Sequence, residues 1–362
     1  MRPGEAGSAA LADVEEPRLD AVPGGRGVTV RVLEVGLDGT DGEIAAGAYG
    51  RAPEGSEQLV LGHEGFGVVA EVGPEVRELA PGDLVVARVR RAQGSSLYDL
   101  LDRPDLTTDP VTYEHGIAGL HGFLTERYVE EPRYLVRVPA TLAPVGVLVE
   151  PTSIVAKALT VVEDVQRRLG VWRPRRAAVL GVGPIGLLGA LALRLEGLEV
   201  TAFGLHPPPY LNATLVEDLG GRYVSTRQRS LSEEAGAEGP YDVVLEATGY
   251  SPLAFEAMGV LARNGILVLS SVTAGSRTAE VPADDLNMRL VLANNVVVGT
   301  VNASRMHFER ALAILAHAEV WHPGWTRRLL THRVEGLERF TEALDLLGTD
   351  GAVKVTVGVG TR

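Results

Sequence analysis

The chain has 362 residues, enough for two domains, and 45% of them are hydrophobic, as in an ordinary globular protein. Its formal net charge of −13 offers no basic field to phosphates, which argues against a nucleic-acid partner. Cysteine is absent, so disulfides are excluded and any metal must be held by His, Asp or Glu. Only two lysines occur, Lys157 and Lys354; every other basic residue is arginine, which we attribute to a GC-rich genome.

Residues 1–154 are predicted to be rich in β-structure, because short apolar runs alternate with Gly/Pro turns. The predicted strands are Val28–Val35, Gly67–Val72, Asp83–Val89 and Tyr134–Val138. Between Arg91 and His121 the sequence is polar and aperiodic, as in a long functional or mobile loop.

Residues 155–291 change to alternating strands and helices, the pattern of a doubly wound parallel sheet. The predicted strands are Ala177–Leu180, Glu199–Phe203, Tyr223–Ser225, Tyr241–Glu246 and Ile266–Ser270, and the predicted helices are Leu187–Glu196, Tyr210–Leu219 and Pro252–Ala262. Asn264-Gly265 is predicted to be the turn before the last of these strands. Beyond them we expect a strand at Val296–Thr300, helices over 304–318 and 336–347, and a β-rich tail at Gly351–Val359.

The N-terminus has no apolar core long enough for a signal peptide. The apolar run Ala177–Leu193 is slightly short for a membrane span and is broken by several glycines and a proline. We therefore expect a soluble protein of the cytoplasm with no membrane partner.

The segment Gly181-Val182-Gly183-Pro184-Ile185-Gly186 fits the pattern G-x-G-x-x-G between a predicted strand and a predicted helix. The first glycine makes the tight turn, the second lets the backbone approach a pyrophosphate, and the third lets the helix pack on the strand. Free N–H groups at the helix N-terminus favour an anion. Gly181, Gly183, Pro184, Ile185 and Gly186 are therefore predicted to bind a dinucleotide.

The residues after the second strand of such a sheet choose between NAD and NADP. Here that strand continues into Leu205 and His206, which are predicted to border the cofactor; His206 either contacts a ribose or a phosphate or lies on the rim of the site. Neither an acid nor an arginine appears, so both NAD and NADP remain open.

A second set of residues has the chemistry of a zinc site. Asp38, His63, Glu64 and Glu150 offer one nitrogen and three carboxylates, while catalytic zinc needs about three protein ligands and an open position. One glutamate is thus in excess: either Glu64 or Glu150 supports the ligands without touching the metal, or the two exchange as ligands. Zinc would act as a Lewis acid on an alcohol, and the Thr40 hydroxyl would carry the proton away.

These motifs resemble the zinc-dependent medium-chain alcohol dehydrogenase superfamily over essentially the whole chain. The resemblance is carried by GHEGFGVVAEVG at 62–73, PGDLV at 81–85 and GVGPIG at 181–186, in that order and at suitable spacing. The chain is most similar to the archaeal-type glucose dehydrogenases, through VGLDGTD, LVLGHEG, TYEHGIAGLHGF, LVEPTSI, YDVVLEATG and VGTVNAS. That subgroup also has Asp38 where most relatives have a metal-binding cysteine.

The resemblance implies a GroES-like catalytic domain of residues 1–154 and 292–362, and a Rossmann cofactor domain of residues 155–291, with the substrate between them. It implies one catalytic zinc on Asp38, His63 and Glu64 or Glu150, and a homodimer or homotetramer. The residues expected near the substrate are Thr40, Glu114, Glu150 and Asn302, and those expected to add cofactor contacts are Thr248 and Asn302.

The sequence departs from the family pattern at three places. The lobe before the TYEHG block has no thiols, so we predict no structural zinc. The arginine pair after the second Rossmann strand is missing, and Ile154 stands where some sugar dehydrogenases have an acid.

The favoured reaction is hydride transfer from an aldose, most simply from its C1 hydroxyl, to NAD(P). The alternatives are the reduction or oxidation of a sugar or cyclitol ketone in a biosynthetic pathway, a zinc-independent quinone or enone reductase of the same fold, and a nucleotide-binding protein without catalysis.

Overall fold

The chain separates into two compact units in the computed structural model, which describes residues 1–92, 94–272 and 276–360. Unit 1 contains residues 1–153, 302–316 and 326–362, and unit 2 contains residues 154–301 and 317–325. Residues 292–301, which the sequence analysis places in the catalytic domain, therefore lie in unit 2. They do so because strand β14 (Val296–Gly299) pairs in parallel with β13 (Leu261–Leu269).

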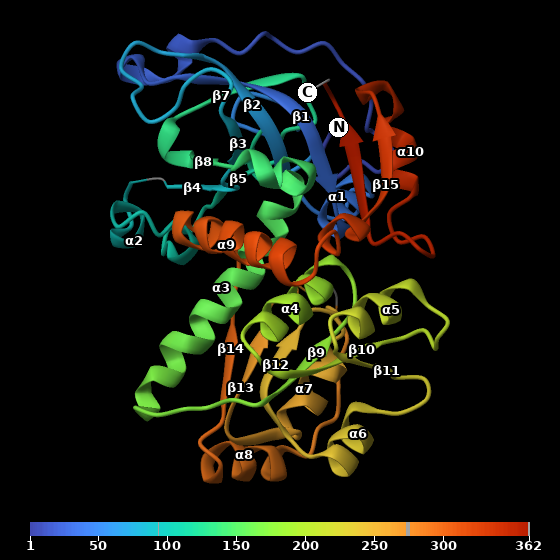
Figure 1. Cartoon of the computed structure of the whole chain (residues 1–362). Coiled ribbons are helices and arrows are strands. Elements are labelled where there is room, and N and C mark those ends of the chain that lie inside the picture. Colours follow the sequence, from blue (N-terminus) through green and yellow to red (C-terminus); the bar gives the residue numbers. More distant parts are fainter. Residues whose placement is uncertain (93, 273–275, 361–362) are drawn as a thin grey trace. The chain divides into compact units, whose positions relative to one another are not determined.

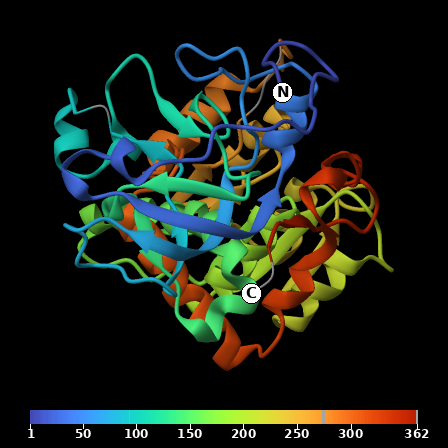
Figure 2. The same ribbon diagram turned by 90° about the horizontal axis from the view of Figure 1, so that it is seen from above.

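Unit 1 is built on a seven-stranded sheet with the order β15-β16-β1-β2-β3-β8, in which β7 also pairs with β1. Figure 2 shows β7 and β1 side by side as antiparallel strands. The strands are β1 (Val28–Leu37), β2 (Glu64–Val72), β3 (Leu84–Ala87), β7 (Arg127–Glu130), β8 (Leu135–Arg137), β15 (Leu330–Glu335) and β16 (Lys354–Gly358). A three-stranded sheet adds β4 (Arg90–Arg91), β5 (Tyr113–His115) and β6 (Gly119–Leu120).

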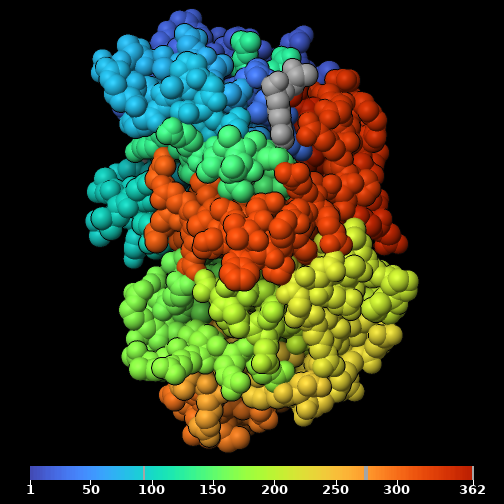
Figure 3. All heavy atoms as spheres, in the orientation of Figure 1, coloured from blue at the N-terminus to red at the C-terminus, as the bar shows by residue number. Residues whose placement is uncertain are grey.

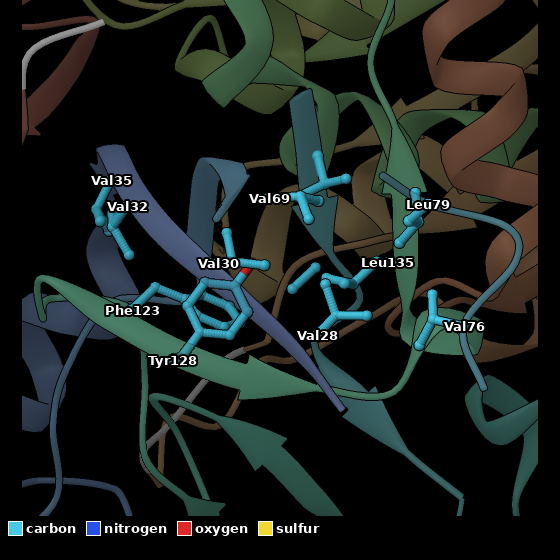
Figure 4. Packing of buried hydrophobic residues seen from close by; sticks show 12 residues of the cluster. Val28, Val30, Val32, Val35, Val69, Val76, Leu79, Phe123, Tyr128 and Leu135 are labelled. Carbon is cyan, nitrogen blue, oxygen red and sulfur yellow. The ribbon is translucent and has the colours of Figure 1, made fainter. Parts of the chain in front are cut away.

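The core of unit 1 lies against β1, whose valines are fully buried. Val30 and its neighbours pack on Phe123 and Tyr128, whose ring centroids are 4.8 Å apart (Figure 4). Burying a side chain of this size contributes about 1.5–3 kcal/mol, so these valines fix the strand at the middle of the sheet. The N-terminal segment lies on the outside of the same unit (Figure 3), where the Met1 ammonium donates to the Leu59 carbonyl oxygen over 2.9 Å.

Unit 2 has a six-stranded, all-parallel sheet with the order β11-β10-β9-β12-β13-β14 (Figure 1). Together with unit 1 it confirms the predicted fold class, because this order is that of a doubly wound dinucleotide-binding sheet. The other strands are β9 (Arg176–Leu180), β10 (Glu199–Gly204), β11 (Arg222–Ser225) and β12 (Tyr241–Glu246); the helices between them are α4 (Pro184–Leu195), α5 (Leu211–Asp218), α6 (Leu231–Glu238) and α7 (Ser251–Met258), and α8 (Ala283–Leu292) precedes β14.

The predicted turn at Asn264-Gly265 is wrong, because both residues lie inside β13. Asn264 has a left-handed φ of 61°, and the pairing with β12 is irregular between Tyr241 and Val243. A local bulge therefore absorbs the Asn-Gly pair within a continuous strand. The remaining α-helices of the described residues are α1 (Gly39–Ala45), α2 (Leu97–Leu100), α3 (Val149–Gln166), α9 (Arg305–Trp321) and α10 (Phe340–Asp345).

Residues 140–169 form the one helical run, within the described parts of the chain, that is long and apolar enough to cross a membrane by length and composition alone. Of its most apolar window, 83% is buried inside the protein, as in a core helix.

Candidate functional site

The start of helix α1 and the start of strand β2 carry three of the predicted metal ligands, Asp38, His63 and Glu64. Asp38 is the N-cap of α1, and its Oδ1 accepts a hydrogen bond of 2.8 Å from the Thr40 N–H. The Asp41 carboxylate accepts two hydrogen bonds, one from the Asp38 N–H (3.1 Å) and one from the Gly62 N–H (3.0 Å). These bonds hold the α1 turn against the start of β2, where His63 and Glu64 lie.

His63 is buried between two carboxylates. Its Nε2 lies 3.6 Å from Asp38 Oδ2, and its Nδ1 lies 3.6 Å from Asp41 Oδ2. Burial opposes a charge on the ring, but the attraction of Asp38 and Asp41 outweighs it and holds the pKa of His63 well above its usual value. A metal-ligating histidine commonly has a carboxylate behind its second nitrogen, which is the position of Asp41.

Glu64 is held by a lysine from the other end of the chain. Lys354 forms a buried ion pair with both carboxylate oxygens of Glu64. The two residues meet across β1, because Gly36 is paired with Glu64 on one side and with Thr356 on the other. A Cβ at Gly36 would lie 1.9 Å from Glu64 Oε2, so the bare backbone makes room for the pair.

Glu150 lies in the first turn of α3 and is also buried. Within the described chain it has no hydrogen-bond partner. Burial and the charges of Glu64 and Asp38 raise the pKa of Glu150 to about 8. The site therefore carries more carboxylate than its cations neutralise, and a divalent cation would remove this excess.

The described residues contain two groups of three potential ligands whose donor atoms lie within 4.8 Å of one another, and both include His63. One is Asp38, Asp41 and His63; the other is His63, Glu64 and Glu150. One imidazole nitrogen with several carboxylate oxygens suits zinc. The structure thus places Asp38, Glu64 and Glu150, three of the predicted ligands, around the fourth, His63.

Two members of this cluster were missed by the sequence analysis. Asp41 was signalled by its position three residues after Asp38, the spacing of a capping box. Lys354 was signalled by composition, because it is one of only two lysines in a chain whose other Lys/Arg-type cations are all arginines. The structure shows that both lysines are buried. An ammonium is a compact point charge, which fits a fully buried pair beside a glycine better than a guanidinium fork.

Thr40 is half-buried at the second position of α1, next to Asp38. Its backbone N–H is bonded to Asp38, while its hydroxyl has no hydrogen-bond partner among the described residues. The hydroxyl is therefore available to a substrate.

Glu114 and Asn302, two predicted substrate residues, form a second polar cluster in unit 1. Glu114 Oε1 accepts from Arg90 Nε (3.1 Å), Arg90 Nη2 (3.0 Å) and Asn302 Nδ2 (2.8 Å). Asn302 is held in the left-handed region, with φ of 58°. Only one oxygen of Glu114 takes part in these bonds, and the other can receive a hydroxyl.

The predicted nucleotide turn connects β9 to α4 in unit 2. Gly181 has φ of +97°, and a Cβ at Gly186 would lie 2.0 Å from the Gly181 carbonyl oxygen. A Cβ at Gly183 would meet nothing within 4 Å, so the backbone there is open to a ligand. No side chain caps α4, and Pro184 occupies its first turn. The free N–H groups of Ile185 and Gly186 are placed to receive a phosphate.

The remaining predicted cofactor residues of unit 2 follow β10 and β12, the two strands that flank β9 in the sheet. Thr248 follows β12, where its N–H donates to Glu246 Oε1 over 2.6 Å. Leu205 and His206 follow β10; Leu205 is 53% exposed, and the His206 ring lies 5.3 Å from that of Tyr210.

The thiol-free lobe is ordered by hydrogen bonds. Ser96 Oγ accepts from the N–H groups of Tyr98 and Thr108, both over 3.2 Å. Ser95 Oγ donates to Asp109 over 2.5 Å, and Arg88 pairs with Asp102 over 2.7 Å.

The fold and the cluster around His63 define the class of medium-chain dehydrogenases, and comparison with known proteins agrees. Residues 24–140 match the alcohol dehydrogenase GroES-like domain, and residues 143–359 match the glucose dehydrogenase C-terminus. The chain belongs to the glucose dehydrogenase family of the zinc-dependent medium-chain superfamily, which confirms the predicted membership.

Relatives of this family match the chain along its whole length. It is 42% identical to a glucose 1-dehydrogenase of Methanocella arvoryzae, over 99% of this chain and 98% of that one. It is also 42% identical to a glucose 1-dehydrogenase of Thermoproteus tenax, over 100% and 99%. Among solved structures, the glucose dehydrogenase of Haloferax mediterranei in complex with NADP, Zn and gluconolactone is similar, with a TM-score of 0.86, 34% identity and 96% of each chain covered.

Proposed function

We propose that this protein is a zinc-dependent sugar dehydrogenase that oxidises the C1 hydroxyl of an aldose, glucose or a close epimer, to the lactone with NAD(P). The observation that carries the proposal is the position of His63 between Asp38 and Asp41, with the unpaired carboxylate of Glu150 beside it. It is supported by the relatives named glucose 1-dehydrogenase and by the Haloferax complex with gluconolactone.

Asp38, His63 and Glu150 would hold the zinc, because Lys354 already engages both oxygens of Glu64. When bound, zinc supplies a Lewis acid that makes the substrate hydroxyl more acidic. The Thr40 hydroxyl, which has no partner among the described residues and adjoins Asp38, would relay the proton: it accepts the substrate hydroxyl proton while its own proton passes to solvent. Glu114, held in place by Arg90 and Asn302, accepts a hydrogen bond from another sugar hydroxyl.

A substrate panel tests this proposal. The zinc-loaded protein is assayed with aldoses, polyols, aminocyclitols and enones, each with NAD and with NADP. The highest kcat/KM is expected for glucose or an epimer, with the lactone as product, and 1,5-anhydroglucitol, which lacks the C1 hydroxyl, should be inert. A preference for a cyclitol or an enone, or full activity after zinc removal, would contradict the proposal.

Substituting Thr40 by valine should slow the reaction without destabilising the fold. The hydroxyl has no protein partner to lose, whereas proton transfer by a positioned group contributes about 10²–10⁴-fold. We expect kcat to fall by about 10²-fold while the urea midpoint stays unchanged. Thr40→Ser is the matched control and should keep most of the activity; equal kcat for the valine variant and the wild type would remove Thr40 from the proton path.

We also propose that the protein is a homo-oligomer. In the described chain β14 pairs only with β13, which leaves one strand edge open, and α8 exposes Met288, Val291 and Leu292. An open edge beside apolar side chains is suited to pairing with a second copy. Light scattering on the purified protein distinguishes a dimer or tetramer from a monomer.

A further inference from the structure

We propose that Arg227, assisted by His206, recognises the 2′-phosphate of NADP, so that this protein prefers NADP to NAD. The inference deepens the proposed function and rests on its nucleotide-dependent part. It assigns a specificity role to a residue outside the segment that follows β10, which contains neither an acid nor an arginine.

The end of β10 is where the adenosine ribose lies in a sheet of this order. After Gly204 the chain continues Leu205-His206-Pro207, and the first carboxylate further along is Glu217, near the far end of α5. An acid at the strand end would bind the ribose hydroxyls and repel a 2′-phosphate. Its absence leaves this position permissive for an anion.

The end of β11 is fastened to this same segment by three hydrogen bonds. The Thr226 N–H donates to the Gly204 carbonyl oxygen (2.8 Å), Ser225 Oγ to that of Leu205 (2.9 Å), and Tyr223 Oη to that of His206 (2.5 Å). Residues 204–206 and 223–226 therefore run side by side.

Arg227 is the next residue after this fastened stretch. The N–H groups of Gln228 and Arg229 both donate to the Ser225 carbonyl oxygen, over 2.9 and 3.0 Å, so Arg227 lies within a tight turn. It is thereby fixed beside the segment that borders the ribose.

The arginines around β11 differ in their partners. Arg229 pairs with Glu234 over 2.7 Å, and Arg222 pairs with Glu234 and Glu238, each over 3.1 Å. Arg227 is exposed and has no partner among the residues that the structure describes. Its guanidinium is thus free to bind a phosphate through two N–H groups, the geometry for which arginine is best suited. His206, half-buried on the adjacent segment, adds a ring N–H donor.

Two nucleotides that differ only in the 2′-phosphate test the proposal: adenosine 2′,5′-bisphosphate and adenosine 5′-monophosphate. Their binding to the zinc-loaded protein is measured by calorimetry. We expect the bisphosphate to bind about 10- to 100-fold more tightly to the wild type, as charge-assisted hydrogen bonds provide. Arg227→Gln should abolish this ratio and leave 5′-monophosphate binding unchanged, and His206→Ala should reduce it by about 2- to 10-fold.

The matched control is Arg173→Gln, which removes the same charge from an exposed site before the amino end of β9. It should keep the wild-type ratio. Equal binding of the two nucleotides to the wild type, an unchanged ratio in Arg227→Gln, or an equal loss in both arginine variants overturns the proposal. Sugar oxidation with NAD but not with NADP would also overturn the role of Arg227, while the proposed sugar dehydrogenase function would stand. Conversely, a binding ratio that depends on Arg227 in a protein that oxidises no sugar would support the role of Arg227 and refute the proposed function.

Discussion

Asp38→Asn should lose both its zinc and its activity while the helix that Asp38 caps remains intact. An asparagine Oδ1 can still accept the Thr40 N–H, but the side chain no longer provides an anionic ligand. Because a Lewis acid contributes several kcal/mol to a charged transition state, we expect kcat/KM to fall by at least about 100-fold. Zinc content after dialysis against a weak chelator should fall well below one equivalent per chain.

Two comparisons make this result specific. Binding of adenosine 5′-monophosphate should be unchanged, since the nucleotide turn belongs to unit 2. Asp41→Asn alters the carboxylate behind His63 and should have an intermediate effect, with a loss of about 10- to 100-fold in zinc affinity. Full zinc occupancy with near-wild-type turnover in Asp38→Asn would exclude Asp38 as a ligand.

Lys354→Met should strongly destabilise unit 1. It removes the cation and leaves the Glu64 carboxylate buried without its partner. Breaking a buried pair by removing one member costs about 3–5 kcal/mol. Tryptophan fluorescence would report on unit 2 and not on unit 1, because unit 2 contains all three tryptophans of the chain, Trp172, Trp321 and Trp325. Hydrogen exchange of β1 and β2 in the zinc-free protein is the suitable measurement.

The double variant Glu64→Gln/Lys354→Met is the control for that experiment. Removing both charges also removes the unpaired one, so protection of β1 and β2 should recover substantially. A Lys354→Met protein with wild-type protection would show that Glu64 does not depend on the lysine.

Much of unit 2 could be predicted because its signals are local. The strand β9, the glycine turn and α4 follow one another within a short segment, and their apolar periodicity and glycine spacing need no distant partner. Helix α3 was not predicted, since it begins Val149-Glu150-Pro151 and is rich in β-branched residues, which favour strands. Only burial in the folded protein makes that sequence helical.

The residues of the candidate metal cluster could be predicted from the sequence, but the contacts that support them could not. Asp38, His63, Glu64 and Glu150 are residue types that bind zinc, and they stand in recognisable motifs. The bond from Lys354 to Glu64 spans 290 residues and depends on the register of β1 with both β2 and β16. No local pattern contains that register, which places Lys354 against Glu64 and leaves Glu150 without a cationic partner among the described residues.

The pairing of β1 with β16 also determines the order in which the two units can form. Unit 2 is mostly one uninterrupted segment, residues 154–301, whereas the central sheet of unit 1 needs strands from both sides of that segment. Closing so long a loop costs entropy before any contact repays it, and sheets of such separated strands assemble slowly. During refolding, the ability to bind nucleotide should therefore return before the ability to bind zinc.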